Sequence, residues 1–453
     1  MLSDVIFKAN DIRGVVVGSQ PEWDAAGALA LGSAFVRLLD LQGHEFVMGR
    51  DMRASGDELS RAFALGAQAA GASLIDIGLA STDELWFASG HWSVPGVQFT
   101  ASHNPAHYNG IKFCLTDAAP VPAGFTTDLA REAQRPLVVA AEPGERRFWD
   151  ALAPYAAHLR SLVDPRPRRR LTVVVDAGNG MAGHTAASVL DGIDLEIIGL
   201  YLTPDGSFPN HPPNPLVPEN LRDAQAAVRE HGADLALVFD GDADRCFIID
   251  ETGTVVDPSV VTALIAEQEL EREPGAAIVI NSITSRSVGE VVEQAGGRIV
   301  TSRVGHTYVK AQMAANDAVF GGEHSAHYYF RDFWGADTGM LAALHVLAML
   351  SATDATLSEL VRRFDRYVRS GELNSTVEDV DVTIARVRDA FAGRGTCVVD
   401  DGLTVTSEAE EWWFNLRPSN TEPLLRLNVE ARERATMVNL RDTVLGLVRT
   451  DNA

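Results

Sequence analysis

The chain has 453 residues, of which 62 are Asp or Glu and 38 are Lys or Arg, so its formal charge is −24. Hydrophobic residues make up 46% and charged residues 22%, a balance that is typical of folded proteins and excludes a disordered chain. The length predicts roughly three domains. The acidity argues against nucleic acids and anionic membranes as partners, whereas a small anionic ligand responds to local charge and stays compatible.

The ends of the chain and its cysteines indicate the compartment. Residues 1–8 lack a basic region followed by an apolar run, so we expect no secretory signal. The longest apolar stretch, residues 338–352, is shorter than the roughly 18 residues of a membrane span and predicts a buried helix. Cys114, Cys246 and Cys397 are odd in number and lack metal-type spacing, which favours a reducing cytoplasm.

Short apolar runs alternate with helical segments through most of the chain. This alternation predicts parallel strands covered by helices, in three related α/β units. After about residue 365 the pattern changes to strand-rich and predicts a fourth, α+β unit. The predicted strands are 45–51 and 73–78, 171–176 and 194–199, 276–281 and 298–300, then 412–416 and 424–429; the predicted helices include 58–70, 288–294 and 436–448. The predicted domains are 1–150, 151–252, 253–365 and 366–453.

Each of the first three units adds an apolar run that ends in an unusual polar loop. The runs are 96–100, 235–239 and 318–320, and the loops are Ala101-Ser-His-Asn-Pro105, Asp240-Gly-Asp-Ala-Asp-Arg245 and Gly321-Gly-Glu-His-Ser-Ala-His327. Ligands collect at the carboxyl ends of strands in open α/β sheets. We therefore expect the three loops to line one cleft.

The second loop carries three acidic residues at alternate positions. In a strand, Asp240, Asp242 and Asp244 would share one face, and in a turn they can converge on one cation. Mg²⁺ prefers oxygen ligands and often binds beside phosphate. The loop therefore predicts a magnesium site.

The other loops carry hydroxyl and cationic side chains. Ser102 lies at a strand end, and Lys112 follows closely enough to return to the same loop and stabilise a phosphate or transfer a proton. In the third unit, Glu323 and Ser325 suit hydrogen bonding to vicinal sugar hydroxyls. His306 and His327 are candidate anion-binding groups. In the tail, Arg417 is suited to bind a phosphate dianion, together with the turn residues Ser419, Asn420 and Thr421.

Four of these motifs occur in one order over almost the whole chain: Thr-Ala-Ser-His-Asn-Pro, Asp-Gly-Asp-Ala-Asp-Arg, Gly-Glu-His-Ser-Ala-His and Arg-Pro-Ser-Asn-Thr-Glu-Pro. Together they resemble the α-D-phosphohexomutases, most closely the bacterial phosphomannomutase/phosphoglucomutase branch. The resemblance implies a heart-shaped α/β fold of four domains around a central cleft. Three of these domains would be related and contain mixed sheets, and the last would be α+β. The resemblance also implies a phosphoserine enzyme that interconverts hexose 1-phosphates and hexose 6-phosphates through a hexose 1,6-bisphosphate, which also serves as activator.

The resemblance implies a role for each matching residue. Ser102 matches the phosphorylated serine, and its phosphoserine oxygen would complete a Mg²⁺ site with Asp240, Asp242 and Asp244. The remaining matches are Arg13 and Arg245 as cations near that centre, Lys112 as acid/base group, Glu323, Ser325 and His327 in the sugar loop, and Arg417, Ser419, Asn420 and Thr421 as distal phosphate clamp. For proton transfer, His306 is the alternative to Lys112, and the sequence does not choose between them. Two positions depart from the family pattern: Asn10 replaces a tyrosine, and Ala326 stands where glycine is common.

Three other functions are compatible with parts of the sequence. A phosphoglucosamine mutase of the same family is one, although residues 322–330 look more like the mannose/glucose branch. A haloacid-dehalogenase-type phosphatase or mutase would use Asp240 as the nucleophile but leaves the serine loop and the Arg417 clamp unexplained. The third is a non-catalytic sugar-phosphate binding protein. The expected partners are hexose phosphates, and the expected state is a monomer or a small homo-oligomer.

Overall fold

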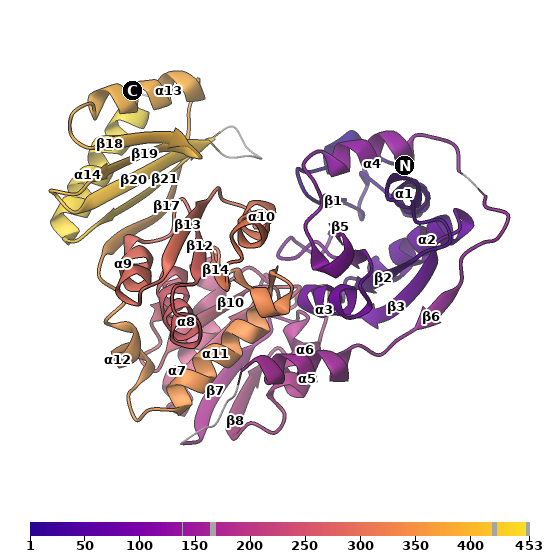
Figure 1. The fold of residues 1–453 in the computed structure, drawn as a ribbon, viewed down its shortest axis with the longest axis horizontal. Coiled ribbons are helices and arrows are strands. Elements are labelled where there is room, and N and C mark those ends of the chain that lie inside the picture. The colour runs from indigo at the N-terminus through magenta and orange to yellow at the C-terminus, as the bar shows by residue number, and fades with distance from the viewer. Residues whose placement is uncertain (138, 164–168, 419–423, 450–453) are drawn as a thin grey trace.

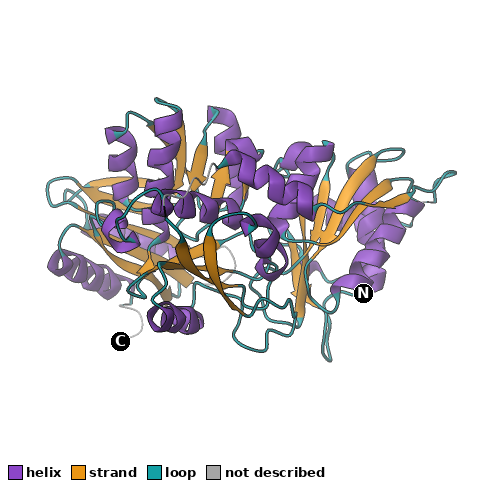
Figure 2. Cartoon of the chain, turned by 90° about the horizontal axis from the view of Figure 1, so that it is seen from below, coloured by secondary structure: helices purple, strands orange, loops and turns teal. Residues whose placement is uncertain are grey.

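The computed structural model describes residues 1–137, 139–163, 169–418 and 424–449, which form four sheets along the chain (Figure 1). Figure 2 shows the same chain from below, with helices beside the sheets. No helix of the described residues is long and apolar enough to cross a membrane. The predicted α/β class with a fourth unit of different type is confirmed.

The first sheet has the order β1-β5-β4-β2-β3-β6. Strand β2 pairs in parallel with β3 and β4, whereas β5 returns antiparallel to β4. The sheet is therefore mixed, and it places the end of β4 beside β5. Its strands are β1 (Ile12–Val15), β2 (Glu45–Arg50), β3 (Ser73–Leu79), β4 (Gly96–Phe99), β5 (Tyr108–Cys114) and β6 (Arg146–Phe148); its helices are α1 (Ala25–Leu38), α2 (Gly56–Ala69), α3 (Thr82–Trp92) and α4 (Phe125–Ala133).

The second sheet has the order β11-β10-β9-β7-β8. Strand β9 is buried along its whole length, as its continuous apolar sequence predicts, and it pairs in parallel with β7. The acidic loop then joins β9 to the antiparallel strand β10. The elements are α5 (Leu152–Leu162), β7 (Leu171–Asp176), α6 (Ala182–Leu190), β8 (Leu195–Leu200), α7 (Arg222–His231), β9 (Leu235–Phe239), β10 (Cys246–Asp250) and β11 (Val255–Val256).

The third sheet has the order β13-β12-β14-β15-β16. The strand predicted at 318–320 is wrong by two residues, because α10 ends in a left-handed residue at Asp317 and the ladder with β12 begins only at Phe320. The apolar stretch 338–352 forms the buried helix α11. The elements are α8 (Pro258–Arg272), β12 (Ala277–Asn281), α9 (Arg286–Gln294), β13 (Arg298–Ser302), α10 (His306–Asn316), β14 (Phe320–Gly322), β15 (Tyr328–Phe330), β16 (Ala336–Asp337), α11 (Gly339–Ser351) and α12 (Leu357–Val361).

The fourth sheet, β17-β21-β20-β19-β18, is antiparallel throughout. Both predicted tail strands and the final helix are confirmed. The elements are β17 (Val368–Thr376), α13 (Val380–Ala390), β18 (Thr396–Asp400), β19 (Gly402–Ser407), β20 (Trp412–Pro418), β21 (Leu424–Ala431) and α14 (Arg434–Val448). In Figure 1 this unit adjoins the third sheet and lies away from the N-terminal unit.

The apolar cores join the first three units and leave the fourth separate. One continuous core includes Ile75 beside β2, Val173 in β7, and Ile278 and Leu341 around the third sheet. The fourth unit packs its sheet against α13 and α14 in a core of its own, which contains Phe414. The strands β9 and β14 are thus rooted in the shared core through Phe239 and Phe320, whereas β4 packs into a second core of the first unit through Val97 and Phe99.

Candidate active site

The serine loop begins directly after β4. The backbone of Ser102 is left-handed, with φ +48°, a conformation that costs roughly 1–2 kcal/mol for a residue other than glycine. Its N–H donates to Thr100 Oγ1 at 2.9 Å, which supports the turn. The side chain is 4% exposed, and its Oγ–H donates to Asp240 Oδ2 at 2.8 Å. The strained turn therefore points the hydroxyl at the acidic loop of the second unit.

A buried arginine that was not predicted from the sequence binds the backbone of the serine loop. Arg53 is 2% exposed, and its guanidinium donates to Asp51 Oδ2 at 3.1 Å. It also donates to four carbonyl oxygens of the serine loop at 2.6–3.0 Å, those of Ser102, Asn104, Pro105 and Tyr108. Arg53 follows the end of β2, so the strand-end rule applied to the other loops could have pointed to it.

The three acidic residues converge after β9, as expected. Asp240, Asp242 and Asp244 are at most 1% exposed, and one oxygen of each lies within 4.8 Å of the others. Asp242 Oδ1 and Asp244 Oδ1 have no hydrogen-bond partner among the described residues. Buried carboxylate oxygens are costly unless they are paired or bind a metal. This donor set, with Ser102 Oγ beside Asp240, fits Mg²⁺, a cation that prefers oxygen ligands.

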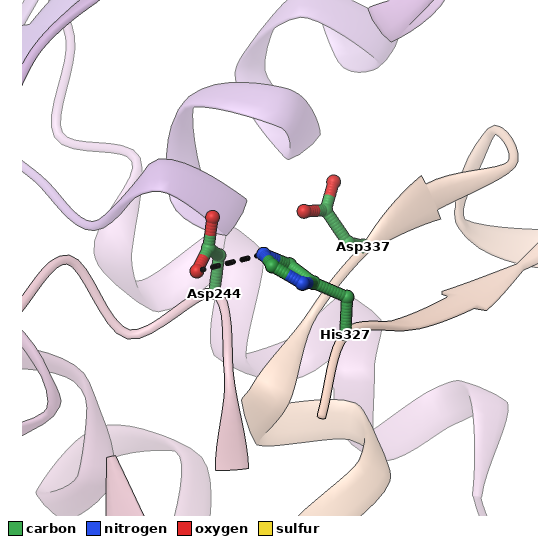
Figure 3. Close-up of side chains that lie close together, drawn as sticks. All are labelled: Asp244, His327 and Asp337. Carbon is green, nitrogen blue, oxygen red and sulfur yellow. Dashed lines mark ion pairs between the residues drawn. The ribbon is translucent and has the colours of Figure 1, made fainter. Parts of the chain in front are cut away.

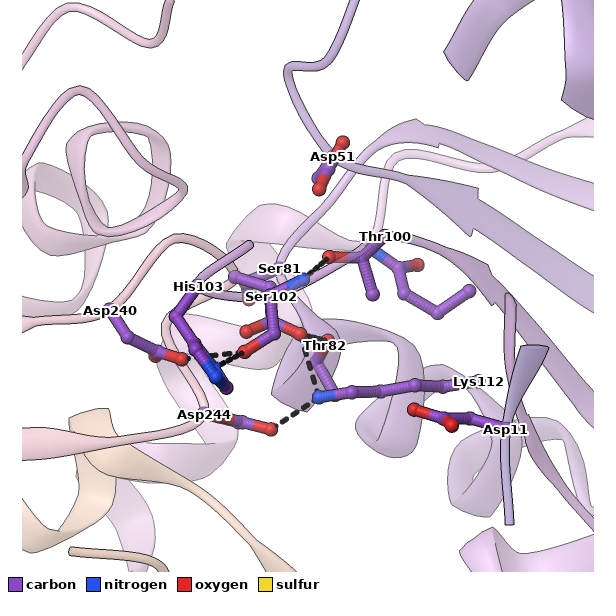
Figure 4. A network of polar contacts seen from close by, with 12 residues as sticks. Asp11, Asp51, Ser81, Thr82, Thr100, Ser102, His103, Lys112, Asp240 and Asp244 are labelled. Atoms are coloured by element: carbon purple, nitrogen blue, oxygen red, sulfur yellow. Dashed lines mark hydrogen bonds and ion pairs between the residues drawn. The ribbon is translucent and has the colours of Figure 1, made fainter. Parts of the chain in front are cut away.

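Two cations face the carboxylates, and Figure 4 shows one of them, Lys112, beside Asp244. Lys112 Nζ in β5 lies 2.7 Å from Asp242 Oδ2 and 2.5 Å from Asp244 Oδ2. Burial opposes its charge, but these carboxylates raise the pKa of Lys112 above its ordinary value, so it stays a cation. Arg245 donates to Asp240 Oδ2 through Nε at 3.0 Å and Nη2 at 2.7 Å.

The loops of the first and second units touch closely. A Cβ on Gly241 would lie 2.4 Å from the Ser102 carbonyl oxygen. The Thr82 hydroxyl at the start of α3 donates to Asp242 Oδ2 at 2.6 Å. The serine loop and the acidic loop therefore pack directly against each other.

A cavity of about 590 Å³ opens at this centre. Burial lowers the pKa of His306, one of its lining residues, to about 4, so that imidazole is neutral at pH 7. Among the predicted site residues, the cavity is lined by Arg13, Ser102, Lys112, Asp244, Arg245, His306 and His327. The structure thus gathers most of the candidates of the first three units around one space.

The third polar loop approaches the acidic loop at His327. Its Nε2 lies 3.7 Å from Asp244 Oδ1, and Asp337 lies nearby on β16 (Figure 3). Burial opposes its charge, but Asp244 raises the pKa of His327. Asp337, which the sequence analysis did not identify, also lines the cavity and pairs with the buried Lys310 at 3.2 Å.

The other two predicted residues of the sugar loop, Glu323 and Ser325, do not line the cavity. Glu323 is 2% exposed and accepts from the Tyr329 hydroxyl at 2.6 Å. Ser325 Oγ lies 2.9 Å from His327 Nδ1. Ala326 adopts φ +66°, a left-handed conformation that explains the preference for glycine at this position.

Arg417, the described residue of the predicted phosphate clamp, lies in the fourth unit and does not line the cavity. Arg417 is 5% exposed, and its Nη2 pairs with Glu372 Oε2 at 2.8 Å. Ser419, Asn420 and Thr421 lie outside the described residues.

Sequence models of the phosphoglucomutase/phosphomannomutase family match this chain in four parts. Its α/β/α domains I, II and III match residues 4–136, 153–253 and 257–367, and its C-terminal domain matches residues 372–447.

Full-length relatives agree with this match. A phosphomannomutase of Escherichia coli is 38% identical over 98% of this chain and 99% of its own length. A protein named phosphohexose mutases from Xanthomonas campestris pv. campestris is 40% identical over 96% of this chain and 97% of its own. A crystal structure of a phosphoglucomutase/phosphomannomutase family protein from Burkholderia thailandensis superimposes with a TM-score of 0.89, at 32% identity and 99% coverage of both chains. The chain therefore belongs to the phosphoglucomutase/phosphomannomutase family and is a phosphohexose mutase.

Proposed function

We propose that Ser102 carries the phosphoryl group in a reversible interconversion of hexose 1-phosphate and hexose 6-phosphate. The observation that carries this proposal is the position of Ser102 Oγ, 2.8 Å from Asp240 beside two further buried carboxylates. Arg245 and Lys112 supply positive charge at the same point. A phosphoryl group attached to Ser102 would be negatively charged, and fixed cations are the groups that stabilise its transfer.

The proposed cycle has two transfers. The bond between the Ser102 oxygen and phosphorus breaks as the free sugar hydroxyl attacks, and a hexose 1,6-bisphosphate forms. The neutral imidazole of His306 accepts the proton of the attacking sugar hydroxyl, and the released Ser102 oxygen takes a proton from water; Lys112 stays charged and stabilises the transferring oxygens. After the bisphosphate turns over in the cleft, the Ser102 hydroxyl attacks its other phosphate and gives its proton to water. His306 returns its proton to the sugar oxygen that leaves, and the isomeric monophosphate departs.

Asp240, Asp242, Asp244 and the Ser102 oxygen would hold Mg²⁺, which when bound supplies charge neutralisation at the phosphoryl group. Two oxygen atoms of this set, Asp242 Oδ1 and Asp244 Oδ1, have no hydrogen-bond partner in the described part of the chain and so are available as ligands. Arg13 lines the cavity, and its Nη1 donates to Asn104 Oδ1 of the serine loop at 3.0 Å. We assign Arg13 to phosphate binding.

The remaining candidates would bind the ligand at a distance from Ser102. We assign the sugar hydroxyls to Glu323, Ser325 and His327. We assign binding of the distal phosphate to Arg417, Ser419, Asn420 and Thr421. Because the clamp belongs to a unit with its own core, we infer that this unit turns towards the cavity to hold the ligand and turns away to let it reorient or leave.

The substrates of this chain are proposed to be mannose and glucose phosphates, in line with the names of its relatives. Glucosamine phosphate is the alternative within the family. Family membership in all four parts favours Ser102 over Asp240 as the phosphoryl acceptor, because the haloacid-dehalogenase scheme gives the serine loop no role. We place the enzyme in the cytoplasm, as a monomer or small homo-oligomer; its three unpaired cysteines support a reducing compartment.

Two measurements test the proposal. Intact and peptide mass spectrometry after incubation with a hexose 1,6-bisphosphate should find one phosphate on Ser102, and Ser102→Ala should lose both the phosphate and turnover. Full mutase activity of Ser102→Ala would overturn the phosphoserine cycle. A coupled assay that compares kcat/KM for mannose, glucose and glucosamine phosphates, with Mg²⁺ and the matching bisphosphate, assigns the substrate.

A further inference from the structure

The turn between β18 and β19 reaches out of the fourth unit and contacts two loops of the third. Asp401 Oδ2 accepts one hydrogen bond from the backbone N–H of Val304 and one from the Ser282 hydroxyl, each at 2.9 Å. Val304 lies two residues before His306, the first residue of α10. One carboxylate oxygen of the fourth unit therefore holds the segment that leads into His306.

The second contact leads towards Glu323. Ser282 directly follows Asn281, the last residue of β12, whose side-chain amide donates to Glu323 Oε2 at 3.2 Å. The turn at Asn281 is tightly closed, since Asn281 Oδ1 accepts from the Thr284 hydroxyl at 2.9 Å. A shift of Ser282 is therefore passed on to the amide that orients Glu323.

The same turn packs against the strand that carries Arg417. Gly402 has φ +79°, and a Cβ there would lie 2.6 Å from the Cα of Arg417. The Asn415 side chain in β20 donates to the main-chain oxygen of Asp401 at 3.0 Å. Strand β20 thus fixes both Arg417 and the Asp401 turn, and a movement of Arg417 moves Asp401 with it.

We propose that Asp401 is a positioning residue that transmits the position of the fourth unit to His306 and Glu323. The proposal rests on the roles assigned above to His306, Glu323 and Arg417. When Arg417 moves to hold the distal phosphate, Asp401 sets the backbone before His306 and the strand end beside Glu323. Capture of the phosphate and the arrangement of groups around the sugar then occur together, although Asp401 does not touch the ligand.

Other bonds also attach the fourth unit to the third, at residues beside these two contacts and without the Asp401 carboxylate. Glu430 Oε1 accepts from the backbone N–H of Arg286 and from the Trp413 indole, both at 3.0 Å. Arg303 pairs with Asp400 at 2.6 Å on the exposed side of the same turn. Loss of the Asp401 carboxylate should therefore leave the unit folded and attached, with its placement loosened.

Three variants of the full chain test the role. Asp401→Ala removes the acceptor of both bonds, Asp401→Asn keeps an oxygen that can accept them, and Asp400→Ala removes only the exposed ion pair and is the matched control. With the hexose 1-phosphate that the parent chain uses best, we expect Asp401→Ala to lower kcat/KM about tenfold and to release more hexose 1,6-bisphosphate per turnover. Asp401→Asn and Asp400→Ala should stay within about twofold of the parent chain.

Hydrogen exchange supplies a readout that does not depend on activity. The Val304 amide should exchange faster in Asp401→Ala than in the parent and in Asp400→Ala, with the core amides of β12 unchanged. Parent-like kinetics in Asp401→Ala would overturn the proposal. The proposal would also be overturned if kcat/KM fell as far in Asp401→Asn as in Asp401→Ala. A parent chain without mutase activity would instead overturn the proposed function.

Discussion

Arg53 offers the sharpest test of how the reaction centre is built. Replacing it with methionine keeps a long side chain but removes the buried guanidinium and all its bonds to Asp51 and the serine loop. Breaking a buried ion pair from one side costs about 3–5 kcal/mol, because the remaining charge is left unpaired. For a domain of 150–250 residues this corresponds to a fall in Tm of roughly 6–20 °C.

A second substitution separates the two effects of Arg53. In the Asp51→Asn/Arg53→Met double variant the unpaired buried charge is gone, so we expect a large part of the lost stability to return. The carbonyl oxygens of Ser102 and Asn104 still lack their donor, so the left-handed turn is not held and phosphorylation of Ser102 should not recover.

The assay combines a thermal melt followed by circular dichroism with the phosphate content of Ser102 by intact mass after incubation with the bisphosphate. The control is Arg61→Met, which removes an arginine whose side chain is 65% exposed on α2 and should change neither readout. The reasoning is refuted if Arg53→Met melts like the parent chain. It is also refuted if the double variant regains full phosphorylation, since the backbone turn would then not depend on the guanidinium.

Four further outcomes are expected. Gly241→Ala should lower stability by about 1–3 kcal/mol in urea unfolding, because the new Cβ meets the Ser102 carbonyl oxygen at 2.4 Å, and parent-like stability would contradict that packing. Chelation of divalent metal should abolish turnover, and Asp242→Asn should raise the Mg²⁺ concentration for half-maximal activity about tenfold; an unchanged Mg²⁺ dependence argues against this ligand. With a pKa of about 4, His306 should show no ring-resonance shift in NMR between about pH 8 and pH 5.5. Since the unfolded chain takes up this proton first, the contribution of His306 to stability is complete above about pH 6.5 and falls as the pH drops towards 4; a midpoint near 6.5 in the folded protein would contradict the burial. Ala326→Gly should raise stability by about 1 kcal/mol by relieving its left-handed backbone, and a lower Tm would show that the alanine methyl group packs favourably.

The sequence predicted the parts of the site that obey local rules. Ser102 and the three aspartates follow buried apolar runs, and the carboxyl end of a strand is where such loops gather. Arg53 was missed although it also follows a strand end, because its bonding partners lie 49–55 residues further along the chain and the strand-end rule does not identify them. Lys112 was a candidate without a partner until the fold brought it to Asp242, 130 residues away.

The fold was predictable in its order of elements and less so in strand direction. Buried runs such as β7 and β9 read correctly as parallel, because both of their faces are covered by apolar groups. The antiparallel returns β5 and β10 were not predicted from the pattern of apolar runs, since they are set by loop geometry after β4 and β9. The shift of β14 has a similar cause, because a left-handed residue at Asp317 delays entry into the sheet.

The separate core of the fourth unit makes this part of the protein exchangeable. A graft of residues 368–448 from a relative would cut through no shared apolar core. Among the described residues, it would need to preserve a polar seam that includes Ser282, Arg286 and Val304. The seam also contains two ion pairs, Asp400 with Arg303 and Arg369 with Asp257. An exchange of this unit would therefore change the reach of the phosphate clamp and leave the close contact of Gly241 with Ser102 as it is.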